Sequence, residues 1–335
     1  MQNLLSEEHI DAFRSSGVLV IENVLSEEEV DIALGGFHEC LGVAGCDVAD
    51  LENTGKSLSA LSSTGGAGGI LDIYWADFKL KVAENEKINR IMSELWASTY
   101  ASETHDLWRH NHGSFDPFQP LAAIDRVCFR LPDTLSLQLG ENAKPLQRHL
   151  APHLDCCPHS DNNESMKWRP IQAFVSLSNT VEDNHGGFEC CPNHHTSFGE
   201  WAETREWGTK AKKGGGEESV PPPCLGAFSP MRPKEDAAVL DKFTHIPVRR
   251  GGMVVWDNRI PHANSRYHRG ETPREVIYLG ILPNVEKNRK YVEEQKKRFA
   301  DGRLPVDFWI GKGREASRQL SSYPFSPFGE KIMMF

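Results

Sequence analysis

The sequence lacks any apolar run of about 18 residues, the length that a membrane-spanning helix requires. Positive charge is also scarce, because Lys and Arg total 37 against 47 for Asp and Glu, which gives a net charge of −10. Nucleic-acid backbones and anionic membrane surfaces attract clustered cations. We therefore expect neither nucleic acid nor a membrane as a partner, whereas 39% hydrophobic residues suffice for a buried core.

A secretory signal and regularly spaced cysteines are missing as well. The opening residues, MQNLLSEEHIDAF, are acidic and do not form a basic segment followed by an apolar core. The cysteines include two adjacent pairs, Cys156-Cys157 and Cys190-Cys191, instead of the spaced pairs typical of structural zinc sites or of a disulfide framework. We therefore expect a reduced, cytoplasmic protein whose cysteines mostly pack in its interior.

Local signals near the N-terminus predict a helix, a strand and a second helix. Ser6 is a good N-cap for a helix that ends at Gly17, and residues 18–25 form an apolar strand candidate. Ser26 and Glu29 have the spacing of a capping box, which predicts that the second helix starts there.

The pattern changes from helical to β-type along the chain. The small residues of GKSLSALSSTGGAGG (55–69) predict a flexible loop, and the apolar spacing over 84–101 predicts a helix. From about residue 124, short β-type runs alternate with turns: IDRVCFRL, PIQAFVSL, FECC, THIPV, MVVWD and VIYLGIL. Many short strands separated by turns indicate a sandwich or a barrel.

We expect a single domain over residues 1–335. Its predicted parts are an N-terminal support of helices and a strand (1–120), a β core (about 121–285) and a C-terminal helical segment (286–335) with a helix over 286–302. A long polar stretch with KAKKGGGEE and PPP interrupts the core. We interpret about 200–240 as a lid-like insertion, because long loops often close over active sites.

Candidate metal ligands come from one of the His-x-Asp triplets. Those that begin at His9 and His159 fall in a predicted helix and a polar loop, whereas His153 and Asp155 have a strand-like context. Residues i and i+2 of a strand point to the same face. A distant strand in GGMVVWDNRIPHANS would add His262, provided that the sheet curls back on itself. Two histidines and one carboxylate are the ligands of non-haem Fe(II) oxygenases, and a surface His and Asp near a turn is the alternative.

Five segments that cover most of the chain carry a further signal: LLSEEHIDAFRSSGVLVIENVLSEEEVDIAL, HLDCCP, RPIQAFVSLSNTVEDNHGGFECCPNHH, IPVRRGGMVVWDNRIPHANS and TPREVIYLGIL. Together they resemble the phytanoyl-CoA dioxygenase family of Fe(II)/2-oxoglutarate oxygenases. The resemblance implies a mainly β fold with flanking α-helices around a double-stranded β-helix (jelly-roll, cupin-like) core. It also implies that His153, Asp155 and His262 bind the iron.

The resemblance further implies a binding site for the cosubstrate 2-oxoglutarate. Arg274 would bind its distal carboxylate, with help from Asn264. A planar guanidinium suits two-point capture of a carboxylate. Arg266 and Arg269 compete for this role, but Arg274 opens a clear strand and is therefore favoured.

Three more residues are candidates for the cosubstrate or substrate pocket. Arg130 would contact substrate or cosubstrate, or else form a structural salt bridge at the rim of the core. Gln172 and Phe174 share one strand face and would line the cavity, with core packing as the alternative for Phe174. The chain departs from the family pattern at Phe174, where relatives often carry Trp, and at Pro192–His195, where the family has Pro-Gly-Ser-His.

The expected activity is oxidation of a C–H bond in a small organic metabolite, by hydroxylation, desaturation or ring closure. Fe(II), 2-oxoglutarate and O2 are the expected cofactor and cosubstrates, with succinate and CO2 as co-products. Asp155 argues against halogenation, because related halogenases replace this carboxylate with a small residue. The alternatives are a protein or peptide hydroxylase of the same fold and a non-catalytic cupin-like or zinc-binding module. The substrate and the oligomeric state stay open.

Overall fold

Helices dominate both ends of the chain and strands dominate its middle. The structure is a computed structural model that describes residues 3–102, 105–140, 144–158, 166–205, 209–211, 214–219, 228–306 and 323–335. The helices are α1 (Glu7–Ser16), α2 (Glu27–Val43), α3 (Leu51–Thr54), α4 (Asp77–Ala83), α5 (Glu86–Ser98), α6 (Asp133–Leu139), α7 (His194–Thr204), α8 (Ala237–Leu240), α9 (Glu286–Ala300) and α10 (Pro327–Met333), with short 3-10 helices at Val48–Asp50, Gly55–Leu61 and Asp106–Trp108. The strands are β1 (Val18–Ile21), β2 (Ile70–Leu71), β3 (Leu121–Arg130), β4 (His153–Leu154), β5 (Ile171–Ser176), β6 (Phe188–Cys190), β7 (Thr209–Ala211), β8 (Glu217–Ser219), β9 (Ser229–Pro230), β10 (Thr244–Ile246), β11 (Met253–Asp257), β12 (His262–Asn264) and β13 (Arg274–Leu282).

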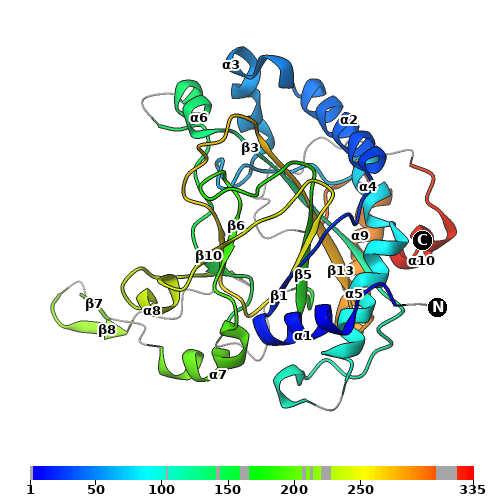
Figure 1. The fold of residues 1–335 in the computed structure, drawn as a ribbon, viewed down its shortest axis with the longest axis vertical. Helices are drawn as coiled ribbons and strands as arrows, with labels where there is room; N and C mark the ends of the chain where they lie inside the picture. The colour runs from blue at the N-terminus through cyan, green and yellow to red at the C-terminus, as the bar shows by residue number, and fades with distance from the viewer. Residues whose placement is uncertain are drawn as a thin grey trace.

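Two antiparallel sheets and a layer of helices form the body of the protein (Figure 1). The larger sheet has the strand order β1-β11-β5-β13-β3-β2, and the smaller has the order β10-β6-β12-β4-β9. Helices α2, α4, α5 and α9 lie on one side of the larger sheet, and β6 and β10 of the smaller sheet lie on the other (Figure 1). The expected mainly β core with flanking helices therefore takes the form of two sheets plus helices. A jelly-roll path stays a prediction.

Alternation along β5 shows how the larger sheet serves two layers. Ile171, Ala173 and Val175 belong to the core beneath the helices. Phe174 points the other way and packs against Phe188 of the smaller sheet, with ring centroids 5.6 Å apart. Because side chains alternate between the faces of a strand, polar residues in step with Phe174 lie on the inner face, between the sheets.

The N-terminal capping signals form the elements that they predict. Ser6 caps α1, and Gly17 ends it in the left-handed conformation with φ of 71°. Ser26 and Glu29 form the predicted capping box of α2. The predicted strand is confirmed only in its first half, as β1, and the predicted helices at 84–101 and 286–302 are confirmed as α5 and α9.

The flexible loop predicted at residues 55–69 is wrong. Its first half is a 3-10 helix, and its glycine-rich second half is a buried turn. A Cβ on Gly66 would lie 2.3 Å from the carbonyl oxygen of Leu146, and a Cβ on Gly69 would lie 2.6 Å from Cα of Arg130. Glycine is therefore needed here for close packing and for positive φ angles. A glycine-rich sequence is typical of such a packed turn as well as of a flexible loop.

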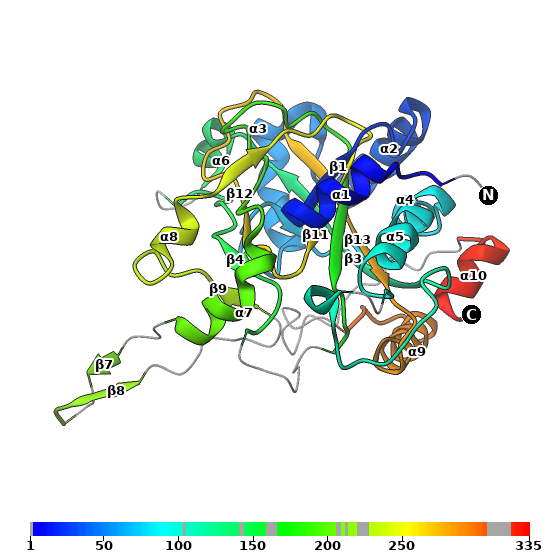
Figure 2. The same ribbon diagram turned by 60° about the horizontal axis from the view of Figure 1, so that its bottom comes forward.

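The predicted insertion at about 200–240 is described only in part. Within it, β7 and β8 form a hairpin that extends away from the body of the protein (Figure 2). Its later residues return to the smaller sheet, where β9 pairs with β4.

In the described part of the chain, no single helix is long and apolar enough to cross a membrane. The helical segments Glu27–Val43 and Val48–Leu61, bent by 69° at their junction, pass that test of length and composition only when they are taken together.

Candidate metal centre

His153 and His262 are neighbours on two paired strands. β4 and β12 are antiparallel in the smaller sheet, and His262 is the register partner of His153. Directly opposed residues of an antiparallel pair place their side chains on the same face, a few ångströms apart. Their ring centroids are accordingly 4.4 Å apart. Both strands lie away from α4, α5 and α9, on the other side of the molecule (Figure 2).

Asp155 completes this group from a position just past the end of β4. Its Oδ1 lies 3.7 Å from Nε2 of His153, and its Oδ2 lies 3.7 Å from Nε2 of His262. One ligand atom from each residue lies within 4.8 Å of the other two, and no other group of His, Cys, Asp and Glu in the described ranges has this geometry. The triplet at His159 lies outside the described residues.

Backbone carbonyls set the tautomers of both histidines. Nδ1 of His153 lies 2.8 Å from the carbonyl oxygen of Ala151, and Nδ1 of His262 lies 3.0 Å from that of Ile260. Because a carbonyl oxygen only accepts, each Nδ1 carries the proton, and each Nε2 keeps a lone pair on the side of Asp155. Burial, assisted by His153, lowers the pKa of His262 to about 3, so this ring is neutral near pH 7 and can ligate a metal.

An arginine that sequence analysis missed supports the carboxylate of the group. Nη2 of Arg169 lies 3.5 Å from Oδ2 of Asp155, and its Nη1 donates to Oδ2 of Asp125 at 2.7 Å. Burial by itself raises the pKa of Asp155, but His153, His262 and Arg169 together hold it below its usual value. The carboxylate is therefore ionised near neutral pH, as a metal ligand must be.

An irregularity in β3 explains the position of Asp125. Val127 pairs with Ile277, but the next paired residues are Ile124 and Leu279, so β3 contains one extra residue. Such a β-bulge re-aims the side chains at the insertion. The sequence showed an acidic residue inside an apolar run. Strict alternation of side chains along a strand could not predict the direction of its side chain, because the bulge interrupts that alternation.

The turn that leads to His262 is held by a buried ion pair. Asp257, at the end of β11, accepts hydrogen bonds from Nε of Arg259 at 2.8 Å and from the hydroxyl of Tyr100 at 2.6 Å. Burial raises the pKa of Asp257, but Arg259 and these hydrogen bonds outweigh it and hold the pKa below its usual value. Because Tyr100 follows α5, this network ties the helical layer to the turn.

Arg274 lies on the inner face of the larger sheet with 1% of its surface exposed. Its Nη1 donates to Sγ of Cys128 at 3.2 Å, and its guanidinium carbon lies 5.4 Å from the ring centre of Phe174. By hydrogen-bond geometry its Nε and Nη2 are buried without a partner among the described residues, although Tyr278 is close enough to help Cys128 outweigh burial and raise the pKa of Arg274. The competing Arg266 and Arg269 are both exposed. A buried guanidinium with free donors is suited to a carboxylate.

The remaining predicted pocket residues differ in how far their polar groups are already bonded. Arg130 donates to the carbonyl of Ser265, which favours its structural alternative. Asn264 donates to the carbonyl of Gly68 at 3.2 Å. Gln172 is buried on the inner face, and its Nε2 has no partner among the described residues.

The cysteines do not take part in the metal group. Cys190 and Cys191 are buried free thiols, and burial raises the pKa of both. They agree with the expected role in packing. Cys157 is disulfide-bonded, so the expectation of a fully reduced chain is wrong at this residue.

The fold and the site define a two-sheet protein with a candidate metal centre of two histidines and one aspartate. The chain belongs to the Gig2-like family, whose model matches residues 155–322. GlcNAc Inducible Gene 2 (GIG2, DUF1479) from Candida albicans has a similar structure, with a TM-score of 0.73 and 16% identity over 99% of this chain and 77% of its own. The hypothetical protein JW0805 from Escherichia coli has a TM-score of 0.70 and 15% identity over 98% of this chain and 81% of its own. At such identities the likeness shows the fold alone. No curated protein sequence matches the chain.

Assignment to the phytanoyl-CoA dioxygenase family is therefore wrong. A 2-oxoglutarate-dependent enzyme, the carbocyclase SnoK from nogalamycin biosynthesis, matches with a TM-score of only 0.46 and 15% identity over 83% of this chain and 85% of its own. The segments that suggested the family include an N-terminal helix–strand–helix pattern and short ligand spacings on strands. Such spacings reflect the geometry of a metal site on a sheet, which unrelated or distantly related families share.

Proposed function

We propose that this protein is an Fe(II)/2-oxoglutarate-dependent oxygenase that oxidises a C–H bond of a small organic molecule. The observation that carries this proposal is the convergence of His153, Asp155 and His262 within 4.8 Å. Two imidazoles and one carboxylate, with further positions open on the metal, are the typical ligand set of non-haem Fe(II) oxygenases.

The chemical state of these residues fits a divalent metal. Both histidines have Nε2 available, and Asp155 is ionised near neutral pH. When bound, iron and 2-oxoglutarate would supply the oxidising chemistry, in which O2 and the oxoacid yield succinate, CO2 and an oxidised substrate. The chain itself holds the ligands in place through the backbone carbonyls and through Arg169.

Arg274 supports 2-oxoglutarate as the cosubstrate. It is buried with two free donors, and a desolvated guanidinium binds a carboxylate strongly. We assign binding of the distal carboxylate of 2-oxoglutarate to Arg274. Asn264 would help by bonding β12 to the glycine-rich turn. Gln172 and Phe174 would border the cosubstrate or substrate from β5.

We further propose that residues 1–335 act as one domain with a jelly-roll core and that the insertion at about 200–240 closes over the metal. Supporting contacts come from the end of that insertion. Pro230 is the register partner of His153, and the ring of Phe228 stacks on the ring of His153 at 4.9 Å between centroids. Closure would exclude water from the site.

Anaerobic addition of Fe(II) and 2-oxoglutarate tests the proposal. A weak visible charge-transfer band is expected for the wild type, and the Asp155→Ala variant should lose it because one anionic ligand is gone. Circular dichroism would confirm that the variant is folded. A screen of small metabolites for substrate-dependent succinate release then identifies the substrate class.

Two outcomes would contradict the proposal. Full iron binding and turnover by Asp155→Ala would show that other residues bind the metal, and the triplet that begins at His159 would be the first to test. Stoichiometric zinc bound through cysteines, without any iron-dependent activity, would favour the binding-module alternative.

A further inference from the structure

A second cavity, of about 450 Å3, lies at the segment that joins β12 to β13. Its walls are residues 268–274 together with Asn179 and His185 from the segment between β5 and β6. None of the three candidate metal ligands belongs to these walls. The volume is in the range of pockets that hold small molecules.

His268 is the first sign that this cavity is built for a ligand. Only 2% of it is exposed, and neither ring nitrogen has a hydrogen-bond partner among the described residues. The ring lies between two glycines: a Cβ on Gly186 would come within 2.9 Å of its Cδ2, and a Cβ on Gly270 within 3.1 Å of its Cε1. Among the described residues, His245 also has two unpartnered ring nitrogens, but His268 lies in a cavity wall, where a ligand can supply the partner that buried polar groups usually have.

The charges around the cavity indicate what that partner is. Two arginines line it, the buried Arg274 and the exposed Arg269. Thr272 adds a hydroxyl, and Glu271 is the one carboxylate among the described residues that line it. Cationic and neutral donors thus outnumber acceptors, which favours an anion.

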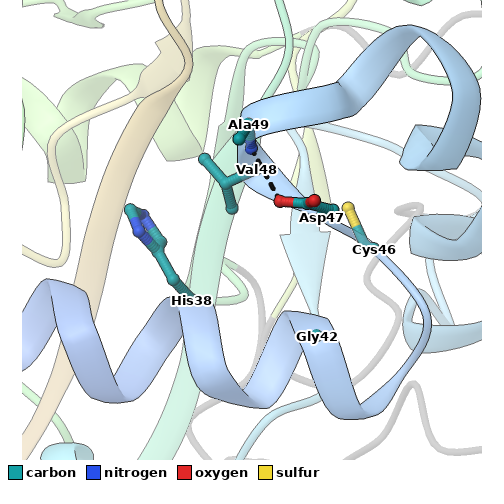
Figure 3. A pocket seen from close by; sticks show the side chains of 6 residues that line it. All are labelled: His38, Gly42, Cys46, Asp47, Val48 and Ala49. Atoms are coloured by element: carbon teal, nitrogen blue, oxygen red, sulfur yellow. Dashed lines mark hydrogen bonds between the residues drawn. The ribbon is translucent and has the colours of Figure 1, made fainter.

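The cavity at the end of α2 makes a useful contrast (Figure 3). It is similar in size, about 480 Å3, but its polar groups are already bonded within the fold. His38 pairs with Glu275 at 2.5 Å, and the carboxylate of Asp47 accepts from the backbone N–H of Ala49 at 2.9 Å. Size alone therefore does not distinguish the two cavities, whereas unpartnered buried donors do.

We propose that the cavity beside His268 binds a small organic anion through a carboxylate or phosphate group, with His268 and Arg269 as its recognition residues. This site goes beyond the proposed oxygenase activity, because it does not include the metal ligands. Arg274 borders both this cavity and the proposed cosubstrate site, and its two unpartnered nitrogens are assigned only to the cosubstrate.

Isothermal titration of the full-length, metal-free protein with inorganic phosphate and, separately, with succinate tests this assignment. We expect one of the two to bind, which identifies the class as phosphate esters or carboxylic acids. Arg269→Gln should weaken binding of that probe about 10-fold, because a charged hydrogen-bond donor is lost. His268→Leu should abolish it. Arg266→Gln is the matched control, because Arg266 is also exposed and also lies over the ring of Tyr267 but does not line the cavity.

Three results would overturn the proposal. The first is that neither probe binds the wild type. The second is that Arg266→Gln weakens binding as much as Arg269→Gln does, which would mean a general effect of surface charge. In the third, saturating 2-oxoglutarate displaces the probe, which would make the cavity part of the cosubstrate site. The Arg269 comparison stays informative if His268→Leu fails to fold. Failure of the oxygenase proposal would show instead in the iron experiment on Asp155→Ala, which this titration does not use.

Discussion

Arg169 links the metal centre, whose histidines lie on the smaller sheet, to β3 of the larger sheet. It bonds Asp125 on the β3 bulge at 2.7 Å and reaches Asp155 at 3.5 Å. Asp125 is largely but not fully buried, and although burial raises its pKa, Arg169 is the main opposing influence and holds the pKa well below the usual range. Arg169 thus acts as a positioning residue for the metal-ligand carboxylate.

We predict that Arg169→Ala weakens binding of Co(II), used as a spectroscopic substitute for iron, by about 10- to 100-fold, the usual range for loss of a partner that supports a metal ligand. Titration followed by the visible Co(II) spectrum measures this. Arg169→Lys should recover part of the affinity, because it restores the charge without the two-point contact. Wild-type affinity in the Ala variant would show that Asp155 needs no such support.

A second prediction about a single residue concerns Arg274 and the binding of 2-oxoglutarate. A hydrogen bond to a charged group contributes about 1.5–3 kcal/mol, so Arg274→Ala should weaken 2-oxoglutarate binding by about 10- to 100-fold while the metal still binds. Arg274→Lys should recover only part of that loss. Arg266→Ala and Arg269→Ala are controls that should leave the KM for 2-oxoglutarate nearly unchanged. Loss of cosubstrate binding in one of these controls, but not in Arg274→Ala, would mean that the assignment after His262 is wrong.

At the scale of elements, the glycine-rich turn before β2 acts as a rigid connector. It packs against the segment that precedes β4 and against β12, where Asn264 donates to Gly68. The turn therefore helps to hold the strands that carry the histidines.

A pair of adjacent glycines tests this role. Gly65 and Gly66 both have positive φ angles, 61° and 77°, but an added Cβ meets nothing within 4 Å at Gly65 and lies 2.3 Å from the carbonyl oxygen of Leu146 at Gly66. Both Ala variants incur the backbone strain, and only Gly66→Ala adds overpacking. We expect Gly66→Ala to lower the free energy of unfolding by about 1–3 kcal/mol more than Gly65→Ala does, as measured by urea denaturation. Equal losses would show that the turn can move away from residues 146 and 147.

At the scale of the whole molecule, the three layers bury many ionisable groups, and this makes stability depend on pH. Burial is the main cause that lowers the pKa of His194 and of His268 to about 4. The folded protein keeps these rings neutral, whereas the unfolded chain takes up protons below its ordinary pKa of about 6.5. Stability should therefore be complete above that value and should fall as the pH drops from about 6.5 toward 4.

We predict a lower free energy of unfolding at pH 5 than at pH 7, with each such histidine contributing up to about 1.4 kcal/mol per pH unit in this window. Urea denaturation with a chelator present measures it. His194→Phe should reduce the slope, because the ring packs against Phe198 and Trp201 while its Nε2 has no partner among the described residues. The exposed His105→Gln is the control and should leave the slope unchanged. A slope unaffected by His194→Phe would contradict the assigned cause.

The sequence by itself determined the features that depend on a few neighbouring residues. Ser6 and Ser26 specify helix starts because their side chains bond backbone groups three positions on. Short runs rich in β-branched and aromatic residues, bounded by turns, mark β5 and β11 as strands. The spacing of His153 and Asp155, with His262 from a distant strand, singled out the residues that the fold brings together.

Only the tertiary structure decided the contacts between distant segments. The partnership of Arg169 with Asp125 depends on a one-residue bulge in β3, and the burial of the glycine-rich turn depends on residues 146 and 147 that lie far along the chain. The burial of the His268 ring against Gly186, without a hydrogen-bond partner among the described residues, likewise follows only from the tertiary structure. Such contacts follow from strand register and loop packing, which are set by the balance of many long-range interactions and leave no local pattern in the sequence.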